Sequence, residues 1–279
     1  MATVTTNVHD REQSMDLGLA GARVVVTGGA SNIGRGIVHV FAAEGARVVI
    51  NDIDEPQAKR VRDEALARGA AAAEVAIADL TTQRGADIAV GTALDTWGGI
   101  DVLVNNAGWS GQQFFATDTN RDNWQRTIET NLFTAIGTTQ AAIGPMKEAG
   151  GGAIAFIASD AAFGQIRTGV YGASKAAMIG LARTVAREHG RHGIRSNVIC
   201  PGLVIPESPE AVGESSLWAT GQDSVFNADQ IDYMVKGTPL RRLTTAEDIG
   251  QATAWFCSPT AARQVTGQLI SVSGGYTMP

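Results

Sequence analysis

The sequence predicts an α/β protein: a single doubly wound domain with a seven-stranded parallel sheet and helices on both faces. Two patterns support this prediction. Short runs of apolar and β-branched residues alternate along the chain with longer, alanine-rich segments of helical period. The short runs, such as "DVLVN" and "AIAFI", are apolar at successive positions, which indicates strands buried on both faces and therefore a parallel sheet covered by helices. The expected architecture is thus of the Rossmann type.

The elements follow from this alternation. Strands are expected near residues 23–27, 46–51, 74–78, 101–104, 153–158, 195–199 and 268–272. Helices are expected near residues 33–45, 55–68, 82–97, 120–148, 170–190 and 245–258. No linker or repeat divides the chain, so residues 19–279 should form one domain after a flexible polar leader, 1–18. Segment 203–239 carries three prolines and interrupts the alternation, and we expect it to be a substrate loop.

Composition excludes several partners. The formal net charge is −6 and no basic cluster is present, which argues against nucleic acid. No apolar run approaches the ~20 residues that cross a bilayer, and the first residues lack the apolar core of a signal peptide. The cysteines, Cys200 and Cys257, are far apart and lack metal-ligand spacing. We therefore expect a cytoplasmic protein with buried thiols, no metal and no membrane.

A glycine-rich turn, "TGGASNIGRG" at 27–36, joins the first predicted strand to the first predicted helix. Such a turn lets the backbone approach a pyrophosphate, which the amides and dipole of the helix N-terminus stabilise. It does not fit G-x-G-x-x-G, nor G-x-x-x-x-G-K-[ST], because Arg35 and Gly36 stand where Lys and Ser/Thr are required. Asn32 stands where a further glycine is expected, but asparagine tolerates a positive φ at modest cost. We therefore expect a variant dinucleotide loop.

An acid at the end of the second predicted strand indicates which dinucleotide binds. Asp52 follows Gly34 by 18 residues, about the separation at which an acid accepts hydrogen bonds from the adenosine ribose. It would repel the 2′-phosphate of NADP(H), and Ser31 and Asn32 offer no positive charge in the turn. We expect the nearby Arg35 to point away on the first helical turn. The predicted cofactor is therefore NAD.

Candidate catalytic residues come from later segments. "VYGASKAAM" places Tyr171 and Lys175 four residues apart, on one face of a helix. A nearby lysine cation lowers a tyrosine pKa from its usual value of ~10, and such a tyrosine can exchange a proton with an alcohol or carbonyl oxygen. Surface helices contain such pairs by chance, but Ser159 ends the fifth predicted strand at the same sheet edge and could hydrogen-bond a reacting oxygen.

Asparagines supply two further signals. "NNAG", residues 105–108, ends the fourth predicted strand at the ligand-binding edge of the sheet. Asn131 falls inside the predicted helix 120–148, a poor place for asparagine unless its amide has a partner. Trp109, Phe114 and Phe115 follow the NNAG turn and are expected either to line an apolar substrate pocket or to pack in the core.

Together these motifs resemble those of the short-chain dehydrogenase/reductase family over residues 19–279. "CPG" at 200–202 and the ending "TGQLISVSGG" match as well. The resemblance implies an oxidoreductase that moves a hydride between a nicotinamide cofactor and a secondary alcohol or its ketone. It implies that Tyr171 is the acid/base and that Ser159 polarises the carbonyl. Lys175 would lower the tyrosine pKa and hold the ribose hydroxyls, and Asn131 would anchor a proton-relay water.

The resemblance also implies the cofactor contacts and the assembly. The contacts are Gly28, Ser31, Asn32, Ile33, Gly34, Asp52, Asp79, Leu80, Asn106, Ala107, Gly108, Tyr171, Lys175, Pro201 and Gly202. The expected assembly is a homotetramer in which the helices near 120–148 and 170–190 pack across one two-fold axis and the C-terminal strand across another.

The substrate is less constrained. The sequence is most similar to the branch of 3-oxoacyl-acyl-carrier-protein reductases and 2-hydroxycyclohexanecarboxyl-CoA dehydrogenase, which implies a cyclic or acyl-CoA-linked hydroxy compound. Segment 203–239, however, holds six acids and one lysine, and would repel a phosphate-rich CoA unless Arg167, Arg241 or Arg242 meets it. A neutral cyclic or aromatic alcohol is therefore an alternative substrate, and an NADPH-dependent 3-oxoacyl reductase and a non-catalytic dinucleotide-binding regulator are the alternative functions.

Two departures from the family pattern stand near the site. Ser159 and Tyr171 are 12 residues apart, one fewer than is common in the family, which indicates a deletion in the intervening loop. Pro206 replaces the threonine that often contacts the nicotinamide amide, and Ser208 could substitute for it.

Overall fold

The computed structural model describes residues 16–111, 114–214, 216, 218–219 and 226–279. In this part of the chain, seven parallel strands form one sheet in the order β3-β2-β1-β4-β5-β6-β7. The strands are β1 (Arg23–Thr27), β2 (Arg47–Asp52), β3 (Ala72–Ile77), β4 (Val102–Asn105), β5 (Gly152–Ile157), β6 (Ile194–Pro201) and β7 (Leu269–Val272). The predicted fold class is confirmed.

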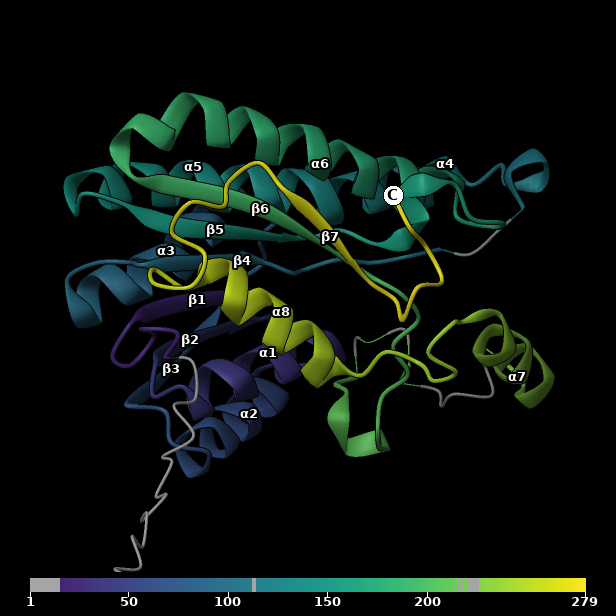
Figure 1. Ribbon diagram of the computed structural model, residues 1–279, viewed down its shortest axis with the longest axis horizontal. Coiled ribbons are helices and arrows are strands. Elements are labelled where there is room, and N and C mark those ends of the chain that lie inside the picture. Colours follow the sequence, from purple (N-terminus) through teal and green to yellow (C-terminus); the bar gives the residue numbers. More distant parts are fainter. Residues whose placement is uncertain (1–15, 112–113, 215, 217, 220–225) are drawn as a thin grey trace, which may run out of the picture.

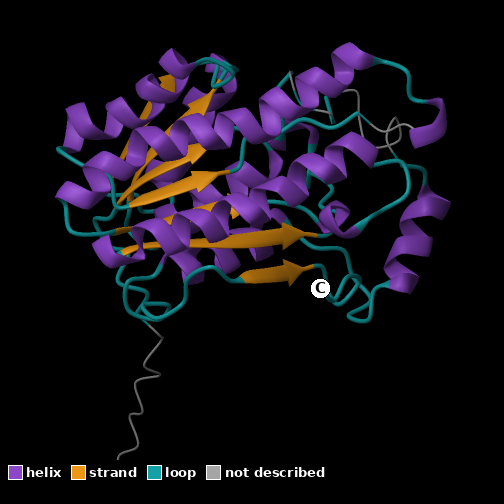
Figure 2. Cartoon of the chain, turned by 90° about the horizontal axis from the view of Figure 1, so that it is seen from above, coloured by secondary structure: helices purple, strands orange, loops and turns teal. Residues whose placement is uncertain are grey.

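Helices cover both faces of the sheet (Figures 1 and 2). One face carries α1 (Asn32–Ala43), α2 (Glu55–Ala67) and α8 (Ala246–Cys257), and the other carries α3 (Gln83–Trp97), α5 (Thr134–Glu148) and α6 (Gly169–His189). Each face has its own apolar core. Phe41 and Ile37 are fully buried in the first, and Phe156 and Met146 in the second. Burial on both sides explains why the strands are apolar at successive positions.

The sheet reverses its winding between β1 and β4. These strands are neighbours in the sheet although two strands separate them along the chain. Connections from the carboxyl ends of β1 and β4 run to opposite faces and open a crevice, where doubly wound sheets bind ligands. The position of α1 above this crevice is fixed by close packing on α8, because a Cβ atom at Gly36 would lie 2.6 Å from the backbone of Ala246.

The predicted helix 120–148 is divided. It consists of α4 (Arg121–Ile128), a π-helical turn (Glu129–Phe133) and α5. The π-helical turn contains Asn131, whose side chain is fully buried and forms hydrogen bonds outside its own helix. A residue inserted into the helical ladder in this way is common at functional sites.

The interpretation of 203–239 as a loop throughout is wrong. A short 3-10 helix (Pro209–Ala211) and the helix α7 (Ala228–Gly237) lie within it. Helix α7 begins at Asn227, which forms a capping box with Gln230. The prolines that suggested a loop lie outside this helix, so they did not predict its absence.

Most of the predicted leader, residues 1–15, lies outside the described residues. Its last residues contact the domain. The carbonyl oxygen of Asp16 accepts a hydrogen bond from the Thr260 hydroxyl at 2.7 Å, and that of Leu17 accepts one from Ser258 Oγ at 2.7 Å. No helix of the described chain is long and apolar enough to cross a membrane.

Candidate active site

The glycine-rich turn leaves β1 and enters α1 at the crevice. Gly28 has a φ of 58°, and a Cβ atom there would lie 2.9 Å from the Cα atom of Ala107. A Cβ atom at Gly34 would lie 1.9 Å from the carbonyl oxygen of Gly28. Asn32 adopts a φ of 40°, so asparagine does take the left-handed conformation expected of the missing glycine. The turn therefore keeps this compact backbone only because two glycines have no Cβ atom to clash with Gly28 and Ala107.

A buried hydroxyl holds the two loops of the crevice together. Thr27 Oγ1 accepts hydrogen bonds from the backbone amides of Asn106 (2.9 Å) and Ala107 (3.0 Å), and donates one to the Val104 carbonyl oxygen (3.2 Å). The side-chain Nδ2 of Asn106 donates to the carbonyl oxygens of Thr27 and Gly28, both at 2.9 Å. The glycine-rich turn and the NNAG turn thus form one rigid unit.

Asp52 lies at the end of β2, where it faces the crevice. One carboxylate oxygen accepts the amide of Ala30 at 3.1 Å, and the other accepts the amides of Ile53 and Asp54 at 2.8 and 3.2 Å. Burial raises the pKa of the carboxyl group, and these amides oppose that rise. The carboxylate is held rigidly, with its remaining lone pairs available to ligand hydroxyls.

Arg35 points away from the crevice, as expected. Its Nε lies 2.7 Å from Glu64 on α2, and its Nη1 lies 2.7 Å from Glu207 in the segment after β6. These carboxylates raise the pKa of the guanidinium, which therefore stays charged while its charge is compensated.

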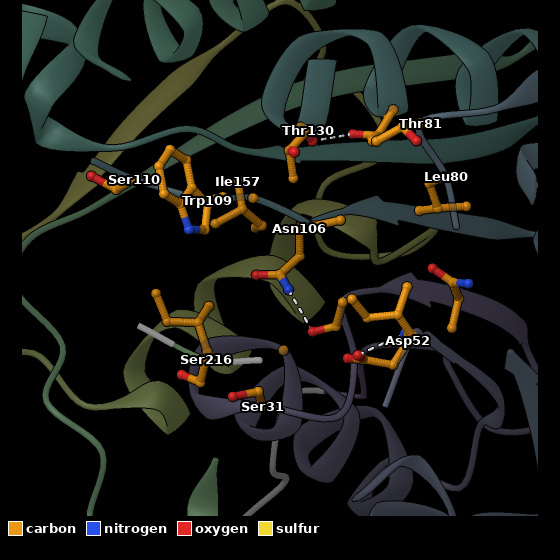
Figure 3. A pocket seen from close by; sticks show the side chains of 18 of the residues that line it. Ser31, Asp52, Leu80, Thr81, Asn106, Trp109, Ser110, Thr130, Ile157 and Ser216 are labelled. Carbon is orange, nitrogen blue, oxygen red and sulfur yellow. Dashed lines mark hydrogen bonds between the residues drawn. The ribbon is translucent and has the colours of Figure 1, made fainter. Parts of the chain in front are cut away.

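The first of two large cavities follows the crevice and has a volume of about 530 Å³ (Figure 3). Thirteen of the fifteen predicted cofactor contacts line it, from Gly28 and Asp52 at one end to Tyr171 and Lys175 at the other. The two exceptions, Pro201 and Gly202, line the second cavity. Figure 3 shows Asp52 and Leu80 at one end, Asn106 in the middle and Trp109 at the far end.

The predicted catalytic side chains converge where the two cavities meet. Tyr171 lines both cavities, and Ser159 lines the second. Burial raises the pKa of Tyr171, and the Ser159 hydroxyl opposes that rise. The Lys175 ammonium lies 5.8 Å from the centroid of the Tyr171 ring and donates to the Ile157 carbonyl oxygen at 2.8 Å. Burial lowers the lysine pKa to about 8.

Asn131 is near this group but lines neither cavity. Its Oδ1 accepts the Trp109 amide at 2.7 Å, and its Nδ2 donates to the Trp109 carbonyl oxygen (3.0 Å) and to Ser174 Oγ (2.9 Å). The partner that asparagine needs inside a helix is therefore present. Through these bonds Asn131 connects the loop after β4 to α6, next to Lys175.

The second cavity is larger, about 1100 Å³, and its described lining comes mainly from the segment between Ser159 and Tyr171, the segment after β6, and the C-terminal tail. Five large apolar side chains of this lining are exposed: Phe163, Ile166, Tyr233, Tyr276 and Met278. The charged residues of the lining are Asp160, Arg167, Asp229 and Arg242. An apolar ligand of considerable size fits this space.

Several residues behave differently from their expectations. Trp109 lines the first cavity, with the Arg126 guanidinium 4.4 Å from its ring centroid. Phe114 and Phe115 are 59% and 76% exposed and line neither large cavity. Ser208, suggested as a substitute for the missing threonine, lines neither cavity.

Several residues that line the first cavity were not predicted from the sequence. Ser216 and Trp218, from the segment after β6, line the first cavity although that segment was assigned to the substrate. Arg126, Glu129 and Thr130 reach the same cavity from the neighbourhood of the π-helical turn. The stretch 126–131 gave one signal, an asparagine inside a predicted helix, but nothing in the sequence indicated which residues face the crevice. Among the described residues, no group of three or more His, Cys, Asp or Glu side chains is arranged to bind a metal ion.

A doubly wound sheet, a rigid phosphate turn and a tyrosine–lysine pair at the end of the same cavity define a dinucleotide-binding oxidoreductase. A sequence profile described as "Enoyl-(Acyl carrier protein) reductase" matches residues 28–277. The 7alpha-hydroxysteroid dehydrogenase of Escherichia coli K12 is 34% identical, over 94% of this chain and 96% of that protein. A 3-oxoacyl-[acyl-carrier-protein] reductase of Chlamydia muridarum is 31% identical, over 92% and 98%.

The structural comparison agrees. A solved structure of 7 alpha-hydroxysteroid dehydrogenase, complexed with NADH and 7-oxo glycochenodeoxycholic acid, superposes with a TM-score of 0.83 and 34% identity, covering 93% of this chain and 96% of that one. The chain therefore belongs to the short-chain dehydrogenase/reductase family. It is a nicotinamide-dependent oxidoreductase that acts on CH–OH groups and the corresponding ketones.

The Thr27 hydroxyl provides the first testable prediction. Thr27→Val keeps the shape of the side chain but leaves two buried amides without an acceptor, which should cost about 1–3 kcal/mol of unfolding free energy. NADH binding, measured by fluorescence titration, should weaken at least about tenfold because the two loops are no longer tied. Thr253→Val is the matched control, since Thr253 is equally buried and bonds only within α8. Unchanged NADH affinity in Thr27→Val would contradict this role.

Proposed function

We propose that the protein is an NAD(H)-dependent dehydrogenase that interconverts a bulky, largely apolar secondary alcohol and its ketone. The observation that carries the proposal is the position of Tyr171. Among the described residues, Tyr171 is the titratable side chain that lines both the dinucleotide cavity and the larger apolar cavity. A proton donor at this junction reaches the oxygen of a substrate in the second cavity, while the substrate carbon bonded to that oxygen faces the first cavity.

The residues present fit a nicotinamide dinucleotide. Gly28 and Gly34 allow the close backbone packing of the phosphate turn at the N-terminus of α1, and Asp52 offers a carboxylate to the adenosine ribose. Lys175, at the opposite end of the cavity, would bind the nicotinamide ribose hydroxyls. When bound, the nicotinamide supplies or accepts the hydride.

The proton is assigned to Tyr171. In ketone reduction its hydroxyl donates a proton to the carbonyl oxygen, while the Ser159 hydroxyl stabilises the charge that develops there. In alcohol oxidation the same proton returns to the tyrosinate. The raised tyrosine pKa keeps the proton in place at neutral pH, which suits the donor role. Asn131 acts as a positioning residue, because its side-chain amide is fully engaged by Trp109 and Ser174.

The assigned proton transfer predicts a pH profile. Ketone reduction needs protonated Tyr171 and cationic Lys175, so its kcat/KM should fall as the pH rises through about 8, where Lys175 loses its charge. Alcohol oxidation needs the tyrosinate and should gain from rising pH.

Tyr171→Phe should lose ~10²–10⁴-fold in rate with NADH affinity nearly unchanged, and Ser159→Ala about 10²–10³-fold. Near-normal turnover in Tyr171→Phe would overturn the mechanism.

Two charges support NAD(H) over NADP(H). Asp52 would lie close to a 2′-phosphate, and two unit charges ~4 Å apart repel by about 4 kcal/mol at an effective dielectric near 20. Arg35, which could offset this repulsion, is bound to Glu64 and Glu207.

We expect kcat/KM to favour NAD(H) by at least ~10²-fold, in keeping with that repulsion. Asp52→Ala should narrow the ratio by weakening NAD(H) and admitting NADP(H). Steady-state kinetics with both cofactors measure this ratio. Comparable efficiency of the two cofactors in the unmutated protein would contradict the assignment.

The second cavity supports a large alicyclic substrate. Its volume and apolar lining suit a polycyclic alcohol, and the relative named above is a hydroxysteroid dehydrogenase. An acyl thioester is the second candidate, because Arg167 and Arg242 line the cavity and 3-oxoacyl-[acyl-carrier-protein] reductases are relatives. Against it, Arg242 is bound to Asp248. Turnover of acetoacetyl-CoA with NADPH, without turnover of cyclic ketones with NADH, would favour the second candidate. Segment 203–239 is proposed to cover the substrate.

A homotetramer is also proposed. Exposed apolar side chains at the proposed interfaces support it, namely Phe133 before α5 and Met278 in the tail. Light scattering should give four times the 29.1 kDa chain mass, and a stable monomer at micromolar concentration would contradict it.

A cytoplasmic location is proposed because Cys200 and Cys257 are unpaired and buried, and burial raises both thiol pKa values to about 12.

A further inference from the structure

The segment after β6 reaches past the substrate cavity to the adenosine end of the crevice. Residues 207–214, here called the strap, run from the sheet edge alongside α1 and α2 (Figure 1). The side-chain amide of Gln57 donates to the Glu210 carbonyl oxygen at 3.0 Å, and the backbone amide of Glu214 donates to Asp54 Oδ2 at 3.0 Å. The Asp54 amide in turn donates to Asp52 Oδ1 at 3.2 Å. The strap is therefore anchored beside the ribose-binding carboxylate.

The first contact of the strap is an ion pair. Glu207 Oε1 accepts from Arg35 Nη1 at 2.7 Å, while the Nε and Nη2 of Arg35 bind Glu64 at 2.7 and 3.3 Å. Glu64 also contacts His39 at 3.0 Å and Arg60 at 3.3 Å. One carboxylate is thus shared by three basic side chains. Glu207 supplies the second negative charge that Arg35 contacts.

Arg35 is a cation next to the phosphate turn. It stands on the first turn of α1, directly after Gly34 of the phosphate turn, and its side chain is only 14% exposed. Both of its partners draw the guanidinium toward α2 and the strap. A guanidinium binds phosphate strongly when its nitrogens are available. Its distance from the ribose therefore depends on the acids that hold it.

We infer that Glu207 determines cofactor specificity by holding the Arg35 guanidinium away from the ribose 2′ position. The segment that covers the substrate thereby takes part in excluding NADP(H), alongside Asp52. The inference rests on the proposed NAD(H) preference, but it concerns a different residue and a different contact. Glu207 should therefore affect the binding of NADP(H), which carries the 2′-phosphate, and not that of NAD(H).

The experiment measures binding of NAD⁺ and NADP⁺ by calorimetry and needs no substrate. Glu207→Gln is nearly isosteric and removes the charge. NADP⁺ should bind at least about fivefold more tightly at ~20 mM salt, with a smaller gain at ~300 mM, because exposed charges are screened. NAD⁺ affinity should stay within about twofold, since Arg35 meets no charge on its ribose. Glu210→Gln is the matched control: it lies in the same strap, and its exposed carboxylate is not a partner of Arg35.

The Arg35→Gln background separates two explanations. If Glu207 acts by holding Arg35, the gain from Glu207→Gln disappears when Arg35 is absent. The inference is overturned if the gain persists there, if Glu210→Gln gives the same gain, or if Glu207→Gln changes both cofactors equally. Equal binding of NAD⁺ and NADP⁺ by the unmutated protein would instead contradict the proposed cofactor. Thermal melts of each variant verify that the fold is retained.

Discussion

The buried hydroxyl of Thr27 is the contact on which the site depends. It lies where the sheet reverses its winding, and it joins the end of β1 to the turn after β4 through two backbone amides. Buried amides require an acceptor, and here the Thr27 hydroxyl supplies it. With the loops tied, Gly28 packs on Ala107 and the phosphate turn keeps its shape. The same unit sets the direction of the crevice toward Tyr171.

Burial governs the chemistry at the other end. It raises the tyrosine pKa and lowers that of the neighbouring lysine to about 8, so both groups shift toward the neutral form. The Ser159 hydroxyl acts in the opposite sense on the tyrosine pKa. Tyr171 thus keeps its proton until a substrate oxygen is present, and Ser159 and Lys175 are the neighbouring donors. A group that can both give and take a proton is what reversible alcohol and ketone chemistry requires.

The sheet and the places of the glycine-rich turn and of Asp52 could be predicted because they follow local patterns: doubly buried strands, a cluster of glycines and an acid at a strand end. The other proposed cofactor contacts came from the resemblance to the family. The π-helical turn at Asn131 and the helix α7 could not be predicted, because each depends on packing or capping. The spacing of apolar residues along the sequence does not reveal either. The partners of Arg35 were beyond prediction for a different reason. Glu207 is distant in the sequence, and only the fold brings it to α1. Asn32 was the reverse case, where the residue type alone indicated the backbone conformation.

Hydride transfer to a carbon atom in the larger cavity is the central claim, and isotope transfer tests it most directly. Purified protein is incubated with NADH in which both hydrogens on nicotinamide C4 are deuterium and with a panel of cyclic and polycyclic ketones, and the products are analysed by mass spectrometry. The account predicts an alcohol that carries one deuterium on the carbinol carbon, and no such product from Tyr171→Phe at comparable time. Saturable NADH binding without deuterium in any product would contradict the account and indicate a dinucleotide-binding protein without turnover.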